Sequence, residues 1–290
     1  MISWLYQRTL NQSFERLSAA RQQLTRDALL RQELAIARDL QSRLYPAAPE
    51  TDDRLRIAAV VLPAMETSGD LYDFIELGPS QLGIVIADVT GKSLAAALVM
   101  AMARSTFRSE ARRSNDPAEV LTQVNAILCS DNSVKQMLTA WYGVLDTRTL
   151  ILRYANAGHP FPILKRDGSV SELDIPGLPL RARPDTVYHE QEILLKPGDD
   201  LLLTSDGAVE TMNGQRELFG FDRFNRALEM LPPLPAGDIL TCLCETLETF
   251  RGPTPQSDDI TLVLIQVNQP ARLEQMARSA TAHPVPAAVA

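Results

Sequence analysis

The stretch Leu82–Met102 constrains the fold more than any other part of this sequence. Leu82–Val89 is an apolar, β-branched run of strand length, Thr90-Gly91 interrupts it, and the residues from Ser93 onward are rich in Ala, Leu and Met. This order is typical of a buried strand followed by a tightly packed helix. Asp88 lies near the end of the strand, where an ionised carboxylate is costly unless another group compensates it.

Three more aspartates occupy the same kind of position. Asp70 precedes the run Leu71–Leu77, Asp206 follows Leu201–Leu203, and Asp258 precedes Ile260–Val267. Any one of them could simply cap a helix or begin a turn. That explanation weakens when four share one setting, whereas a bound cation would explain all of them. Mg²⁺ and Mn²⁺ suit a few carboxylates together with retained waters.

Short motifs around these aspartates occur in a fixed order along the chain. They are Gly69-Asp70-Leu71-Tyr72-Asp73-Phe74, Ala87-Asp88-Val89-Thr90-Gly91-Lys92 with Ala95-Ala96-Ala97-Leu98, Asn156-Ala157-Gly158-His159-Pro160, Pro197-Gly198-Asp199-Asp200, Ser205-Asp206-Gly207 with Glu210, and Asp258-Asp259-Ile260-Thr261-Leu262. Together they resemble the motifs of the PPM-type metal-dependent protein serine/threonine phosphatases. The similarity is closer to the bacterial branch that serves sporulation and stress-response partner switching, and it spans about Ile57 to Val267 in family order.

The resemblance implies an α+β fold of two packed antiparallel sheets flanked by helices. It also implies two Mn²⁺ or Mg²⁺ ions, bridged by Asp88, with the Val89 carbonyl, Asp206 and Asp258 as further ligands and Asp70 acting through a water. In that chemistry the ions activate a water that attacks a phosphoserine or phosphothreonine without a covalent intermediate. Paired carboxylates also occur in glycosidases, but the ordered motif set does not resemble one.

The resemblance further predicts a phosphorylated partner protein as substrate, of the anti-sigma-factor antagonist type. The alternative is a non-catalytic protein that keeps the PPM fold and signals by binding. Retention of the four aspartates favours catalysis, because a pure binder has no physical need for a costly carboxylate cluster.

Several nearby residues leave alternatives open. His159 suits a structural turn or, less readily, a general acid. Lys92 belongs either to a solvated face or to phosphate binding, and Asp73 either to packing and hydrogen bonding or to the metal. Substrate access or loop order could be altered by departures from the family pattern at Ser68, Ser93 and Arg181.

Composition limits the classes of partner and the cellular compartment that this sequence fits. A net charge of −8 and a pI near 5.0 argue against a nucleic-acid partner. Cys129, Cys242 and Cys244 form neither a zinc spacing nor a plausible disulfide framework, which favours reduced thiols in a cytoplasmic protein. No apolar run is long enough to span a membrane, and Met1–Leu10 lacks a signal-peptide core.

The N-terminal region predicts one long helix over Gln12–Leu44, ended by Pro46. Two short heptad blocks meet there at a one-residue phase slip, formed by Leu10, Leu17 and Leu24 and then by Leu30, Ala37 and Leu44, with Leu34 in the seam. This pattern fits a helix docked on its own domain, or a helix that pairs with a second copy or an upstream sensor. We expect residues 1–48 to form a regulatory linker helix, 49–268 the catalytic domain, and 269–290 a disordered tail.

The remaining elements alternate between runs of strands and paired helices, which predicts a layered α+β fold. Helices are expected at Ser93–Arg113, Pro117–Cys129, Phe221–Met230 and Ala236–Phe250. Strands are expected at Leu55–Pro63, Leu71–Leu77, Leu82–Val89, Met137–Leu145, Leu150–Ala157, Val187–Leu195, Asp200–Thr204 and Ile260–Val267.

Overall fold

The computed structural model describes residues 2–49, 51, 53–131 and 135–269, with side chains 2–20 and 27 outside the description. The expected tail over 269–290 therefore lies almost wholly outside the described residues, as do the side chains of Leu10 and Leu17.

Two five-stranded antiparallel sheets form the centre of the described chain. The first has the strand order β1-β10-β9-β6-β7, with β1 (Leu55–Leu62), β10 (Ile260–Val267), β9 (Asp200–Thr204), β6 (Ile163–Arg166) and β7 (Ser169–Glu172). The second has the order β2-β3-β4-β5-β8, with β2 (Asp70–Gly78), β3 (Gln81–Val89), β4 (Leu138–Asp146), β5 (Ile151–Ala157) and β8 (Glu190–Leu194).

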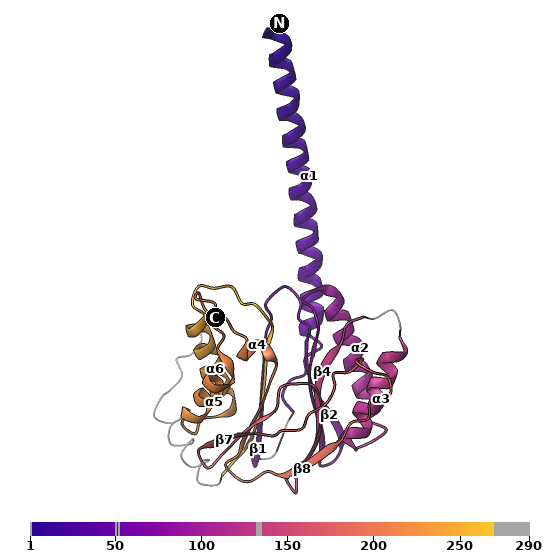
Figure 1. The fold of residues 1–290 in the computed structure, drawn as a ribbon, viewed down its shortest axis with the longest axis vertical. Helices are drawn as coiled ribbons and strands as arrows, with labels where there is room; N and C mark the ends of the chain where they lie inside the picture. The colour runs from indigo at the N-terminus through magenta and orange to yellow at the C-terminus, as the bar shows by residue number, and fades with distance from the viewer. Residues whose placement is uncertain (1, 50, 52, 132–134, 270–290) are drawn as a thin grey trace.

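Helices cover both outer faces of this sandwich (Figure 1). α2 (Leu94–Ala111) and α3 (Pro117–Ser130) lie on the β2–β8 sheet, and α5 (Gly220–Met230) and α6 (Ala236–Arg251) lie on the other sheet, after the short helix α4 (Asp206–Val209). The prediction of two packed antiparallel sheets flanked by helices is confirmed.

Strand β3 is apolar along most of its length because both of its faces are buried. Ile84 and Ile86 lie in the core between the two sheets, together with Leu203 of β9. Val85 and Ala87 face the opposite way and share a second core with Phe107 of α2 and its neighbours. A strand buried on both faces has no polar alternation, so its ends are where charged side chains can be placed.

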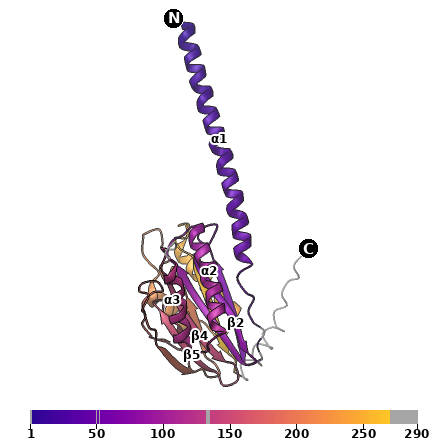
Figure 2. The ribbon, with the colours of Figure 1, turned by 90° about the vertical axis from the view of Figure 1, so that its right-hand side faces the viewer.

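The helix α1 (Ile2–Ser42) projects from the sandwich as a long rod and meets it only near its C-terminal end (Figures 1 and 2). It begins earlier than expected, because the residues before Gln12 contain no Gly or Pro to stop it. Leu24 and Leu30 are 70% and 55% exposed. The interpretation of a helix docked along its own domain is therefore wrong for Leu24 and Leu30, whereas Leu44, just beyond the end of α1, packs against the core beneath α2 and α3.

The hairpin β6–β7 was not predicted from the sequence. Its strands are short, and β7 is largely exposed, so apolar alternation is weak. The available signal was the two-residue loop Asp167-Gly168, in which both residues have positive φ, at 53° and 81°. Asp-Gly between two runs is a strong hairpin signal because this turn requires φ above zero at both positions.

Candidate metal centre and active site

The pairing of β2 with β3 brings the first two aspartates together. Asp70 begins β2 and lies directly opposite Asp88 of β3 in the antiparallel register. Directly opposed residues project to the same face, with Cβ atoms about 4.5–5.5 Å apart. Asp70 is almost fully buried, whereas Asp88 is partly exposed.

The other two aspartates come from the opposite sheet. Asp206 begins α4, with only Ser205 between it and the end of β9, and Asp258 lies just before β10, which pairs with β9. The backbone between them is tightly apposed, because a Cβ at Gly207 would collide with the Asp259 carbonyl oxygen and lie 3.2 Å from the Asp258 Cβ. Only glycine fits at that position.

A hydrogen bond joins the two halves of this cluster. The Thr261 hydroxyl, on β10, donates a 2.6 Å hydrogen bond to Asp70 Oδ2 on β2. A Cβ at Gly69 would lie 2.8 Å from the Val89 carbonyl oxygen and 3.6 Å from Asp88 Oδ1, so the Gly69 backbone lies against the residues expected to bind metal. The four aspartates thus meet at one end of the sandwich.

Their charges repel one another. Burial, and then the charge of Asp88, raise the pKa of Asp70 well above its usual value. Burial, followed by Asp206 and Asp258, raises the pKa of Asp88 to about 7. The pKa of Asp206 is also raised, by burial and by its acidic neighbours. The cluster therefore carries negative charge that the protein compensates poorly.

Lys92 supplies one positive charge to the cluster. Its ammonium lies 2.8 Å from Asp258 Oδ2 and also donates to the Ser257 carbonyl. Neither sequence interpretation of Lys92, as a solvated residue or as a phosphate ligand, anticipated this ion pair.

The donor set fits a hard divalent cation, since carboxylate and carbonyl oxygens are its preferred ligands. Among the described residues, no three Asp, Glu, His or Cys side chains close around a single point as ligands do around a bound ion. Binding would therefore require the carboxylates to draw together, which the positive charge of the ion would favour.

Asp259, next to a predicted ligand, has a different role. Its Oδ1 accepts a 2.7 Å hydrogen bond from the Ala64 backbone N–H, and its Oδ2 accepts one of 2.8 Å from Gly69. Asp259 thus fixes the loop that leads into Asp70. Thr261 is a further residue whose role sequence reasoning missed, although it lies within the Asp258-Asp259-Ile260-Thr261-Leu262 motif.

The end of α1 contacts the same loop. Gln41 Nε2 donates to the Ser68 carbonyl at 2.6 Å, and its Oε1 accepts from the Ser68 N–H at 2.9 Å. Beyond the helix, the Tyr45 hydroxyl donates to the Asp70 carbonyl at 2.8 Å, and the Tyr45 ring stacks on Tyr72. The Ser68 hydroxyl accepts from the Asp70 N–H at 3.0 Å, so this departure from the family pattern has a local structural use.

His159 belongs to a structural turn. Its N–H donates to Asn156 Oδ1 at 2.8 Å, its carbonyl accepts from Asn156 Nδ2 at 2.9 Å, and its Nδ1 lies 2.9 Å from the Thr139 hydroxyl. The ring is buried, and burial lowers its pKa to about 3. A histidine held neutral in this way is a poor proton donor near neutral pH.

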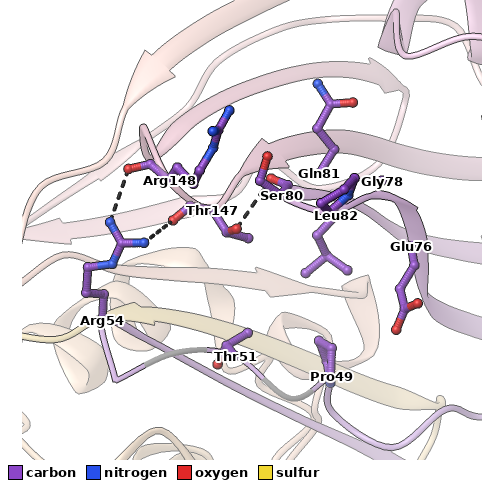
Figure 3. A pocket seen from close by; sticks show the side chains of 11 residues that line it. Pro49, Thr51, Arg54, Glu76, Gly78, Ser80, Gln81, Leu82, Thr147 and Arg148 are labelled. Atoms are coloured by element: carbon purple, nitrogen blue, oxygen red, sulfur yellow. Dashed lines mark hydrogen bonds between the residues drawn. The ribbon is translucent and has the colours of Figure 1, made fainter.

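A separate hollow of about 430 Å³ lies at the far end of the same strands, around the β2–β3 and β4–β5 turns (Figure 3). Arg54 at its edge donates to the Thr147 and Arg148 carbonyls, at 3.2 Å each. This guanidinium joins the start of β1 to the β4–β5 turn. None of the four aspartates lines the hollow, so it is not part of the candidate active site.

Comparison with known proteins identifies the class. The model of the Stage II sporulation protein E (SpoIIE) family matches residues 78–268, and this chain belongs to that family. The resemblance drawn from the sequence motifs is therefore confirmed.

Individual relatives agree with this assignment. The phosphoserine phosphatase RsbU of Bacillus subtilis is 31% identical over 189 residues, covering 64% of this chain and 56% of RsbU. The RsbU and RsbW domains of Rv1364c from Mycobacterium tuberculosis align with 28% identity and a TM-score of 0.66, over 77% of this chain and 62% of that one. The SiaA-PP2C domain of Pseudomonas aeruginosa shares the fold at 24% identity and a TM-score of 0.73, over 83% of this chain and 98% of that domain.

The chain spans about half the length of the curated relatives it matches, between 43% and 58% of the first three. None of its described helices is both long and apolar enough to cross a lipid bilayer. The three cysteines, Cys129, Cys242 and Cys244, are free thiols, as predicted.

Proposed function

We propose that this chain is a metal-dependent phosphoprotein phosphatase that removes phosphate from serine or threonine of a partner protein. The observation that carries the proposal is the meeting of four aspartates at one end of a PP2C-type sandwich. Membership of the SpoIIE family and similarity to a protein named as a phosphoserine phosphatase support it. Metal dependence is a property of this family.

Two Mn²⁺ or Mg²⁺ ions would be held by Asp88, the Val89 carbonyl, Asp206 and Asp258, with Asp70 acting through a water. When bound, such ions neutralise charge on the phosphate and lower the pKa of water. The protein's own contribution is orientation: Thr261 fixes the Asp70 carboxylate, and Asp259 fixes the loop before it.

The test measures hydrolysis of para-nitrophenyl phosphate by the full chain, together with calorimetric titration of Mn²⁺. Activity should require Mn²⁺ or Mg²⁺. Asp88→Asn and Asp206→Asn should each lower turnover by more than about a hundredfold and weaken Mn²⁺ binding, since losing even a residue that only supports a metal ligand costs about 10–100-fold. Both variants should remain folded by circular dichroism.

Cys129→Ser is the control, and it should leave activity unchanged because the proposal uses no thiolate nucleophile. Turnover without metal, or full turnover in Asp88→Asn, would refute the two-metal proposal. Mn²⁺ binding without turnover of any phosphoprotein would instead favour the non-catalytic interaction protein, which the costly carboxylate cluster makes the weaker candidate.

For the substrate, we propose a phosphorylated anti-sigma-factor antagonist. Its support is the closeness to partner-switching relatives, among them a protein in which RsbU and RsbW domains occur together. Phosphoproteomics with and without this protein tests the assignment directly. The substrate should lose its phosphoserine or phosphothreonine signal only when the active chain is present, and not with Asp88→Asn.

We further propose that residues 1–48 form a regulatory segment and 49–268 the catalytic domain. Support comes from the bonds of Gln41 to Ser68 and of Tyr45 to Asp70, which connect the end of α1 to the loop carrying a predicted site residue. Rotation of α1 by a second copy or an upstream sensor would then change how well the site holds metal.

A helix scan read out as activity against Mn²⁺ concentration tests this regulation. Leu34→Glu, Leu44→Glu and deletion of 1–30 should shift the Mn²⁺ midpoint while the sandwich stays folded. If all three leave the curve in place, α1 is only an appendage and the proposed coupling is wrong.

A further inference from the structure

A second hollow, of about 390 Å³, opens directly beside the aspartate cluster. Asp206 forms part of its wall, and Thr139, also in the wall, lies opposite Asp88 in the β3–β4 register. The rest of the wall comes mainly from the β5–β6 turn, through His159, Pro160 and Phe161, and from Phe221 at the start of α5. Its size lies near the lower end of the range of about 300–1,000 Å³ for ligand pockets.

Three of the side chains that line the hollow are apolar rings. The rings of Pro160, Phe161 and Phe221 offer no hydrogen-bonding group, and Phe221 is 44% exposed at the edge of a helix. The exposed Phe221 ring is informative because it lines one hollow together with Pro160 and Phe161. Contiguous exposed apolar surface marks ligand-binding grooves, whereas a single exposed apolar side chain does not.

The turn that carries Phe161 is held firmly. Asn156 bonds to His159 through both its oxygen and its nitrogen, and Gly158 has a φ of +74° and forms a bridge to Ala140 of β4. The apolar wall is therefore preformed, which lowers the entropy cost of binding a side chain against it.

We propose that this hollow is the subsite for an apolar side chain next to the phosphorylated residue of the substrate. The inference rests on the proposed phosphatase function and deepens it. A phosphate held at the aspartates places the neighbouring residues of an extended peptide within a few ångströms, because each adds about 3.3 Å. Leu, Ile, Met or Phe at a neighbouring position would bury its side chain against Phe161 and Phe221.

The charges around the hollow select against acidic neighbours. Asp206 and Glu172 both line the hollow, and Glu172 Oε1 accepts a 3.1 Å hydrogen bond from Asn225 Nδ2. An acidic side chain entering here would face both carboxylates. The expected order of preference at that substrate position is Leu, then Ser, then Glu.

The experiment uses the full chain with Mn²⁺ and a set of phosphoserine peptides. Each peptide carries Leu, Ser or Glu at one of the two positions on either side of the phosphoserine, and kcat/KM is measured by phosphate release. The Leu peptide should exceed the Ser peptide by about tenfold at one or more positions, the scale set by placing a small apolar group in a pocket.

Phe221→Ala should bring the Leu-to-Ser ratio to within about twofold of one, and Phe221→Leu should restore part of it. Because the ratio compares two peptides on the same variant, a general change in turnover cancels. The matched control is Met230→Ala, a substitution of an apolar residue that is 78% exposed on the same helix but outside the hollow; its ratio should equal that of the unmodified chain.

A flat profile across all positions in the unmodified chain, or a Leu preference that survives Phe221→Ala, overturns the subsite. Failure of the proposed phosphatase function is distinguishable from both results, since no peptide would then release phosphate at any Mn²⁺ concentration. Thermal melting of each variant verifies that it is folded, and the exposure of Phe221 makes the Ala variant tolerable to the fold.

Discussion

Strand β2 carries two buried aspartates, Asp70 and Asp73, whose charges are treated in opposite ways. Asp73 is fully buried, and it accepts hydrogen bonds of 2.6 and 2.7 Å from Arg108, while Arg104 Nε lies 3.1 Å away. Asp70 is almost as buried, yet its carboxylate receives a neutral Thr261 hydroxyl and faces the carboxylate of Asp88.

The difference indicates that Asp73 stabilises the fold, whereas Asp70 is available to a metal ion. Both guanidiniums come from α2, so the Asp73 cluster ties the helix to its sheet and leaves little demand for a further cation. Asp73 as a metal ligand is therefore an interpretation that the ion pair disfavours. At Asp70 the protein supplies only hydrogen bonds, and a carboxylate pair left without cations is best explained by an ion that binds from solution.

Replacing Asp73 and Asp70 by asparagine, one at a time, tests this difference most directly. Asp73→Asn should lower the free energy of unfolding by about 3 kcal/mol, near the low end for a broken buried ion pair because both arginines are partly exposed. Asp70→Asn should leave it unchanged or raise it, since repulsion with Asp88 is removed. Urea unfolding of the metal-free protein measures both, and equal losses would show that the two aspartates are compensated alike.

The sequence was sufficient for the positions of the four aspartates because each lies where a strongly patterned strand begins or ends. It could not assign the partners of Asp73, because Arg104 and Arg108 lie on α2 and meet β2 only after helix and sheet pack. Pairing of this kind depends on the angle and rotation of a whole helix, which local patterns do not determine.

The sequence also could not assign the separate roles of the adjacent carboxylates Asp258 and Asp259. Asp258 and Asp259 are neighbours in sequence, and both lie just before β10 rather than within it, so strand alternation does not determine which of them faces the cluster. Their directions depend on how the chain enters β10, and the structure assigns Asp259 to the Ala64 and Gly69 N–H groups. The contact of Gln41 with Ser68 likewise joins segments that no periodicity relates.

His159 extends the comparison to a third way of burying an ionisable group, in which the group stays neutral. Its pKa is lowered by burial to about 3, below the ordinary value of 6.5, so the unfolded chain takes up a proton first as the pH falls. The stability that neutral His159 contributes is therefore complete above about pH 6.5 and is lost progressively toward pH 3.

Between pH 7 and pH 5 this loss should reach about 2 kcal/mol. His159→Gln should remove it, so the difference in unfolding free energy between the two proteins should change by that amount over the interval. Measuring the difference matters because the raised pKa values of Asp70 and Asp88 act in the opposite direction in both proteins. Parallel pH profiles would mean that His159 is not held neutral.

Substitution of Lys92 should have the smallest effect in this series. It tests whether a protein cation competes with a bound metal ion, because in the described structure Lys92 is the one cationic side chain paired with an aspartate of the cluster. The pair with Asp258 is partly exposed, at 38% and 26% for the two side chains, so it should contribute no more than about 1 kcal/mol. A bound ion at Asp258 would compete with this ammonium. Lys92→Gln should therefore tighten Mn²⁺ binding by about two- to fivefold, as measured by calorimetric titration.

The matched control is Lys196→Gln, which makes the same change in net charge in the turn before β9, at the end of that strand away from Asp206. It should leave Mn²⁺ affinity within error of the unmodified chain. Raising the salt concentration should shrink the Lys92 effect, because exposed charges are screened. Weaker Mn²⁺ binding in Lys92→Gln would mean that the lysine holds the Asp258 carboxylate in position for the ion. The cluster would then depend on a protein cation, as Asp73 does, and the contrast between the two kinds of aspartate would fail.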